Sequence, residues 1–322
     1  MQSPTPGRSE ISSRTRVLLT GGTGFVGSHV ARVCVAAGCD TYVLARPGSS
    51  LARLEGALES LTIIRGSLDE AADPQLLTEL EPDVCIHLAW YAEPGRYLRA
   101  VPENLAALRS SLDLIEALAV AGCPRVVVAG SCAEYGQASS DTTFTEAFPV
   151  RPTTPYARAK AALFLAAQDM AANAGMGLAW ARLFFLYGPW EQPQRVVPTA
   201  IEACLAGRGL GATLGEQVRD YLHVADVAEA LWAVAQSPLL GPVNISSGHG
   251  VQLRAVLEAI EGAAGTPGLI RFGERPYADD EWLWMHGDNT LLRATGWYPR
   301  FTLETGIAET LAWWRSHLVS AT

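Results

Sequence analysis

The sequence predicts an α/β fold in which a doubly wound parallel sheet is followed by a smaller lobe. Short apolar runs alternate with helical patterns along the first half of the 322 residues. The first apolar run ends in a cluster of glycines that leads directly into a helical pattern. Hydrophobic residues make up 49% of the chain, enough for a sizeable core. Such alternation is typical of parallel strands joined by crossover helices.

Residues 16–27, RVLLTGGTGFVG, form the first of these units, a buried strand that feeds a glycine turn. A helical pattern follows over residues 28–37, so the turn brings backbone N–H groups and the positive end of a helix to one point. The spacing fits both GxGxxG and GxxGxxG through Gly21, Gly22, Gly24 and Gly27. A lone glycine triplet is a weak signal, but one between a strand and a helix predicts a Rossmann-type dinucleotide site.

The remaining elements follow in order. Further strands are expected at residues 41–45, 61–65, 84–89, 125–130 and 178–185. Further helices are expected at residues 104–121, 156–173, 198–206 and 224–235, with a loop at 137–154 and a polar turn at 215–220. The late tryptophans Trp297, Trp313 and Trp314 are expected to be packing residues. We divide the chain into a flexible tail (1–15), a dinucleotide-binding domain (16–188) and a smaller substrate-binding lobe (189–322), partly interleaved with it.

The charge and composition of the chain limit the kinds of partner and the cellular location that we expect. The net charge of −9 gives no reason to expect nucleic acid or an anionic membrane. The six cysteines lack metal-ligand spacing, so we expect reduced core residues and no metal site. No apolar run reaches the length of a membrane span, and residues 1–15 do not resemble a signal peptide. We therefore expect a cytoplasmic protein.

The end of the second strand indicates which dinucleotide binds. An acidic side chain there accepts the ribose hydroxyls of NAD, whereas an arginine favours the extra phosphate of NADP. The sequence VLARPGSS has no acid at this place and offers Arg46, Ser49 and Ser50 instead. NADP(H) is therefore preferred and NAD(H) remains possible, since Arg46 could also be an ordinary solvated arginine before a Pro-Gly turn.

One lysine marks the expected site of chemistry. Among 24 lysines and arginines only Lys160 is a lysine, which suggests a place where a compact ammonium is required. Tyr156 lies four residues earlier, on the same side of a helix, where the ammonium would lower the pKa of the phenol. Ser131 follows the fifth strand at the carboxyl edge of the sheet. The tyrosine–lysine spacing alone also fits an exposed helix pair, but its combination with Ser131 and the glycine turn is specific.

At this point the chain resembles the extended short-chain dehydrogenase/reductase family of nucleotide-sugar epimerases, dehydratases and ketoreductases. The motifs that carry the resemblance, in order, are TGGTGFVG, HLAW, the helix of Asn104, GSCAEYG, YARAK, RLFFLYGP and RDYLHVADVAEA. The resemblance implies that Ser131, Tyr156 and Lys160 are catalytic and that two long helices form a homodimer interface. It places these residues at the cofactor: Gly21, Gly24, Phe25, Val26, Gly27, Arg46, Ser49, Ser67, Leu68, Leu88, Ala89, Asn104, Tyr156 and Lys160.

The candidate substrate contacts are Tyr91, Arg96, Cys132, Phe185 and Arg219. By resemblance Arg219 would meet the diphosphate of a nucleotide sugar. Tyr91, Arg96 and the neighbouring Tyr97 could equally be loop-packing residues.

At several positions the chain departs from the family pattern, and these departures reduce the number of reactions that we expect it to catalyse. Sugar 4,6-dehydratases carry Asp and Glu where this chain has Cys132 and Ala133, which predicts against dehydration. Glu134, the nearest carboxylate, is expected to be a structural hydrogen-bonding residue. Phe185 replaces the asparagine often used near the substrate phosphate, and Ser67 replaces an aspartate in the adenine loop.

Two histidines and a carboxylate that could suggest acid–base roles have simpler interpretations. His87 and His223 have no partner ligands nearby in sequence and are expected to be structural. Asp226 is expected to be a helix-start carboxylate.

The preferred interpretation is an NADPH-dependent reductase of a nucleotide-linked 4-keto-(6-deoxy)hexose, with Tyr156 as the proton donor to the oxygen at C4. The alternative is an epimerase of the same family. A reductase of non-nucleotide ketones and a nonenzymatic NADP-sensing module are further possibilities.

Overall fold

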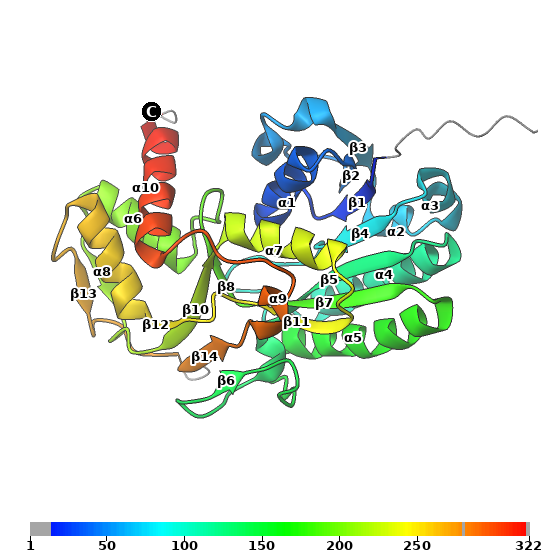
Figure 1. The fold of residues 1–322 in the computed structure, drawn as a ribbon. Coiled ribbons are helices and arrows are strands. Elements are labelled where there is room, and N and C mark those ends of the chain that lie inside the picture. Colours follow the sequence, from blue (N-terminus) through cyan, green and yellow to red (C-terminus); the bar gives the residue numbers. More distant parts are fainter. Residues whose placement is uncertain (1–13, 279–280, 320–322) are drawn as a thin grey trace, which may run out of the picture.

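A computed structural model describes residues 14–278 and 281–319. Its centre is a seven-stranded sheet of order β11-β7-β5-β4-β1-β2-β3, in which every pairing is parallel (Figure 1). The strands are β1 (Arg16–Thr20), β2 (Asp40–Ala45), β3 (Leu61–Arg65), β4 (Val84–His87), β5 (Arg125–Ser131), β7 (Gly177–Leu183) and β11 (Gly241–Ile245). The predicted α/β fold is confirmed, and the strand order reverses between β1 and β4, where ligands of such sheets bind.

Helices cover both faces of this sheet. On one face α1 (Phe25–Ala36) packs against α7 (Val224–Gln236), and on the other α4 (Val101–Val120) packs against α5 (Pro155–Ala174) (Figure 1). Two apolar clusters fill the spaces between helices and sheet. Short helices lie in the remaining connections between strands of this sheet: η1 (Ala52–Leu54), η2 (Leu58–Ser60), α2 (Leu68–Ala71), α3 (Pro74–Leu80) and η3 (Cys132–Tyr135).

A second group of elements forms the smaller lobe. Its sheet contains β6 (Thr143–Phe144), β8 (Phe185–Tyr187), β10 (Val218–His223), β12 (Gly250–Gln252) and β14 (Trp284–Gly287), while β9 (Leu210–Ala212) pairs with β13 (Ile270–Phe272). Its helices are α6 (Val196–Leu205), α8 (Leu253–Ala264) and α10 (Leu303–Val319), whereas α9 (Thr290–Arg293) packs against β11 of the large sheet. A separate apolar cluster joins α6, α8 and α10. Although they follow residue 189, α7 and β11 pack on the large sheet.

The structure corrects three of the predicted elements. The expected strand at 178–185 is two strands, because the chain leaves β7 at Leu183 and β8 pairs with β10 instead. The expected loop at 137–154 contains β6, which pairs with β14. The expected turn at 215–220 gives way to β10 from Val218 onward.

Several simpler expectations are confirmed. All six cysteines are free and buried. His87 is buried between Thr20 and Ser111, and His223 caps α7. Trp297 and Trp314 are buried packing residues. Within residues 14–278 and 281–319, no helix has the length and apolar character needed to cross a bilayer. Residues 1–13 of the expected tail lie outside the described residues.

Candidate active site

The glycine turn joins β1 to α1 at the switch point of the sheet. Gly21 has φ +71°, and a Cβ there would lie 2.8 Å from Ala89 N and from Leu88 C. A Cβ on Gly27 would lie 2.2 Å from Gly21 O. Both positions therefore require glycine. The bare backbone of the turn and the N-terminus of α1 fit the pyrophosphate of a dinucleotide, so the residues present suit NAD(P).

Other predicted cofactor residues surround this turn. Leu88 and Ala89 follow β4, and their backbone N–H groups donate to the backbone and side-chain oxygens of Thr20 at 3.2 Å each. Phe25 and Val26 open α1. Ser67 caps α2, whose first residue is Leu68; its hydroxyl accepts from Glu70 N at 3.2 Å.

Three arginines, on α1, after β2 and on η1, form no ion pair with a carboxylate within the described residues. Arg46 is exposed after β2, and its carbonyl accepts from Ser49 N at 3.0 Å. Arg53 Nη1 lies 3.5 Å from Thr23 O in the glycine turn, and its Nε is buried with no hydrogen-bond partner. Arg32 donates to Ser28 O at 2.8 Å and to Arg53 O.

Burial lowers the pKa of both Arg32 and Arg53, and no carboxylate in the described part of the chain pairs with either. No motif marked these two arginines in the sequence, since their approach to the turn comes from the packing of η1 on α1. Two uncompensated guanidinium groups beside the turn suit an additional phosphate.

The three expected catalytic residues come together at the carboxyl edge of the sheet. Ser131 ends β5, and Tyr156 and Lys160 lie one turn apart at the start of α5. The Ser131 hydroxyl accepts from Ala133 N at 3.2 Å. Lys160 Nζ donates to Ala129 O at 2.7 Å and lies 3.7 Å from the centre of the Trp90 ring.

Proton affinities at this site differ from the sequence-based expectation. Burial raises the pKa of Tyr156 above its ordinary value and lowers the pKa of Lys160 to about 7. The ammonium does not lower the pKa of the phenol here, because desolvation is the largest influence on both groups and Lys160 donates to a backbone carbonyl. Tyr156 therefore holds its proton and is suited to act as an acid.

Glu134 is a structural residue, as expected. Its carboxylate is fully buried and pairs with Arg182 Nε at 2.9 Å. It also accepts from Trp180 Nε1 at 2.9 Å and from Ser131 N at 2.8 Å. These contacts hold the backbone of Ser131 in place and occupy the carboxylate. Beside it, burial raises the pKa of the Cys132 thiol to about 12, so the thiol is neutral.

The loop after β4 places Tyr97, rather than Arg96, against Tyr156. The ring centres of Tyr97 and Tyr156 are 4.9 Å apart and nearly perpendicular. Tyr91 and Arg96 instead both contact the exposed Glu93, with Tyr91 Oη donating at 2.6 Å.

Asn104 supports this loop from α4. Its amide donates to Tyr97 O at 2.7 Å and to Ala100 O at 2.8 Å, and its oxygen accepts from Trp90 Nε1 at 2.8 Å. Trp90 thus connects Asn104, Lys160 and Tyr156, a role that the HLAW motif alone did not assign.

The two remaining substrate candidates lie on the smaller lobe. The guanidinium of Arg219 in β10 is 4.4 Å from the centre of the Phe185 ring in β8. Arg219 also forms an ion pair with Glu281. The cation predicted to meet a diphosphate is present on the lobe, balanced here by a carboxylate.

Comparisons with known proteins agree with this geometry. Residues 17–246 match the NAD dependent epimerase/dehydratase family. A dTDP-glucose 4,6-dehydratase of Xanthomonas campestris is 28% identical over 92% of each chain. A UDP-glucose 4-epimerase of Rhizobium meliloti is 29% identical over 93% of this chain and 97% of its own.

A solved structure shows the same fold. The UDP-glucose 4-epimerase of Thermus thermophilus, in complex with NAD, superposes with a TM-score of 0.84 at 28% identity and covers 94% of this chain and 99% of its own. With a family match over most of the chain, a glycine turn shaped for a dinucleotide and a Ser–Tyr–Lys set beside it, the chain belongs to the NAD dependent epimerase/dehydratase family.

Proposed function

We propose that the protein is an NADPH-dependent reductase of a nucleotide-linked 4-keto-(6-deoxy)hexose. The observation that carries the proposal is the set of cations at the adenosine end of the cofactor site. Arg46 directly follows β2, where NAD enzymes carry an acid, and Arg53 and Arg32 lie beside the glycine turn without carboxylate partners in the described structure. A preference for NADP(H) favours net reduction.

The neighbours of Ser131 support the same choice. Cys132 is neutral and Ala133 has no titratable group, so neither can remove or donate a proton at the carbons next to the keto group. Glu134 is held by Arg182 and Trp180. The elimination step of a dehydratase has no acid–base pair at these positions.

The reduction can be derived from the residues at the edge of the sheet. The nicotinamide, when bound, supplies the hydride. Tyr156 donates its proton to the substrate oxygen that becomes the alcohol, and the raised pKa of its phenol suits that role. Ser131 holds the same oxygen through its hydroxyl. Lys160, fixed on Ala129 O and over Trp90, presents its ammonium one helical turn from Tyr156.

The direct test is incubation of the purified protein with NADPH and a nucleotide-linked 4-keto-6-deoxyhexose. We expect NADPH to be oxidised in equal amount to the alcohol formed, with NADH used less efficiently. Formation of an epimerised product with no loss of NADPH would reject the reductase.

Epimerisation is the second candidate, favoured by the similarity to UDP-glucose 4-epimerases. Such an enzyme would use the same Tyr156 in both directions and retain its cofactor. Conversion of UDP-glucose to its C4 epimer by the protein as isolated, without added NADPH, would support this candidate.

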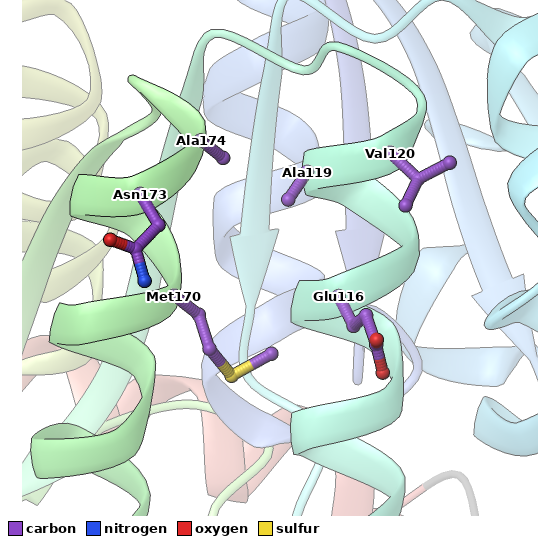
Figure 2. Close-up of a pocket in the computed structure, with 6 residues that line it drawn as sticks. All are labelled: Glu116, Ala119, Val120, Met170, Asn173 and Ala174. Carbon is purple, nitrogen blue, oxygen red and sulfur yellow. The ribbon is translucent and has the colours of Figure 1, made fainter.

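We also propose a homodimer built on α4 and α5 and a cytoplasmic location. A groove between the two helices is lined by Glu116, Ala119, Val120, Met170, Asn173 and Ala174 (Figure 2). Val120 is 69% exposed and Leu165 is 65% exposed on these helices. Exposed apolar side chains on two adjacent helices are typical of an interface. Six buried free cysteines fit a reducing compartment.

A further inference from the structure

The loop after β8 has a backbone that its surroundings hold in an unusual conformation. Trp190 has φ +70°, a left-handed conformation that a non-glycine residue keeps only when neighbouring contacts hold it. Its ring centre lies 4.9 Å from that of Trp313 and 5.2 Å from that of His317, both on α10. His29 Nε2 donates to Pro189 O at 3.1 Å. The loop is thus fixed from α10 and α1.

This loop carries a buried carboxyl group without a complete set of partners. Glu191 follows Trp190 directly and is 8% exposed. Its Oε2 is buried and has no hydrogen-bond partner in the described structure. Burial raises the pKa of the carboxyl to about 8, against the opposing charge of Arg195. Buried polar atoms are nearly always paired, so this unpaired oxygen in a fixed loop is available to accept from or donate to a ligand.

The neighbours of Glu191 border the reacting site on both sides. The guanidinium of Arg195 lies 5.0 Å from the centre of the Tyr97 ring, which packs edge-on against Tyr156. At its other end the segment that carries Glu191 begins at β8, which pairs with β10, where the ring centre of Tyr221 is 5.8 Å from that of Phe185. Glu191 therefore lies on the segment that runs from β8, next to Arg219, to Arg195, which lies over Tyr97.

We propose that Glu191 binds a hydroxyl group on the sugar of the substrate. This proposal rests on the proposed function, since it assigns the sugar end of the same nucleotide-sugar site. A hydroxyl both donates and accepts, so it can pair with the carboxyl in either protonation state. A phosphate oxygen could pair only with the protonated acid, and an ammonium would pair well only with the ionised one. The hydroxyl is the ligand that a buried carboxyl beside an arginine accommodates throughout neutral pH.

Calorimetry on the NADP⁺-loaded protein tests this assignment. The Kd values of UDP, UDP-glucose, dTDP and dTDP-glucose are measured for the wild type, Glu191→Gln and Glu191→Leu. Glu202→Leu, on α6, is the matched control. We expect the wild type to bind one nucleotide sugar more tightly than the corresponding nucleoside diphosphate. Glu191→Leu should raise the Kd of that nucleotide sugar about tenfold and leave the Kd of the diphosphate unchanged. Glu191→Gln, which keeps a donor and an acceptor, should retain most of the difference.

Thermal unfolding separates this role from a purely structural one. Because Oε2 has no partner, Glu191→Leu should have a Tm at least equal to that of the wild type, whereas loss of a structural contact would lower it. If Glu191→Leu weakened the binding of diphosphate and nucleotide sugar equally, or weakened the binding of neither, the hydroxyl assignment would be overturned. The proposed function would stay in place. A wild type that binds neither nucleotide nor nucleotide sugar would overturn both.

Discussion

Tyr156 is the residue on which the proposed chemistry depends. Its phenol holds its proton because burial raises its pKa. Tyr156→Phe should lower kcat by about 10²- to 10⁴-fold, the usual contribution of a positioned acid, with little change in cofactor affinity. Steady-state kinetics and NADPH titration measure the two effects.

Tyr97→Phe is the control for this substitution, since it keeps the ring that packs on Tyr156 and supports Arg195. It should retain about the wild-type rate. If Tyr156→Phe matched the wild-type turnover, another group would have to supply the proton.

The proposed preference for NADP(H) rests on the arginines beside the glycine turn. Replacing Arg53 with Gln should remove a charge-assisted contact to the extra phosphate, worth about 1.5–3 kcal/mol. The KM for NADPH should rise about 10- to 100-fold, while that for NADH stays unchanged.

Arg109→Gln, an exposed position on α4, is the matched control and should alter neither value. A parallel rise in both KM values for Arg53→Gln would show that Arg53 supports the turn rather than the phosphate.

Buried histidine gives the fold a predictable response to acid. His87 bonds Thr20 Oγ1 at 2.6 Å and Ser111 Oγ at 2.9 Å, and burial lowers its pKa from 6.5 to about 3. The unfolded chain therefore binds a proton at His87 more readily than the folded chain does. The stability that neutral His87 contributes above pH 6.5 is lost as the pH falls toward 3.

Urea unfolding between pH 7 and pH 4 checks this dependence. His87→Gln should show a shallower decline in the free energy of unfolding than the wild type, although it starts from a lower value. Parallel curves would mean that other groups control the acid sensitivity.

The sequence predicted that the three candidate catalytic residues lie together, but not which contacts they make. Ser131 follows a strand and Tyr156 and Lys160 share a helix face, so local patterns place all three at one edge. The position of Lys160 over Trp90 depends on how the segment after β4 packs on α5. That packing joins residues 70 positions apart and leaves no local signal. The lowered phenol pKa was a wrong prediction because the burial that raises the pKa of Tyr156 is likewise a property of the folded chain.

At the scale of elements, the ion pair between Glu134 and Arg182 joins η3 to β7 across the reacting edge. The carboxylate is fully buried and the guanidinium is 3% exposed. Glu134→Gln leaves a buried cation without its counter-charge, so the free energy of unfolding should fall by about 3–5 kcal/mol. Chemical denaturation of the wild type and the variant measures this loss of stability.

A double variant tests whether the loss comes from the unpaired charge. Glu134→Gln combined with Arg182→Met removes both charges and should cost less than the sum of the two single changes. Additive losses would show that the two groups stabilise the fold independently.

Element boundaries were predictable where hydrophobic periodicity changed and not elsewhere. The third strand agrees with β3 at residues 61–65, because an apolar run ends there in a glycine. The run at 178–185 stays apolar across the break between β7 and β8, so nothing local marks the transfer to the second sheet. The β6 strand has two residues and exists through its pairing with β14, far away in sequence.

At the scale of the whole molecule, the exposed apolar side chains of α4 and α5 predict the proposed homodimer. In a two-fold interface each substitution acts twice. Leu165 is 65% exposed, and replacing it with Glu would bury a charge in both copies and remove two apolar side chains, a loss of about 3–6 kcal/mol. The dissociation constant should rise at least about 100-fold, as measured by sedimentation velocity over a range of concentrations.

Leu214→Glu is the matched control, because Leu214 is 47% exposed on the smaller lobe, away from α4 and α5. It should leave the sedimentation profile unchanged. A wild-type chain that sediments as a monomer at all concentrations, or a Leu165→Glu variant that remains dimeric, would contradict the interface. Since α5 also carries Tyr156 and Lys160, we expect a monomeric Leu165→Glu variant to lose stability in the same helix that positions the acid. Its kcat should then fall together with its Tm.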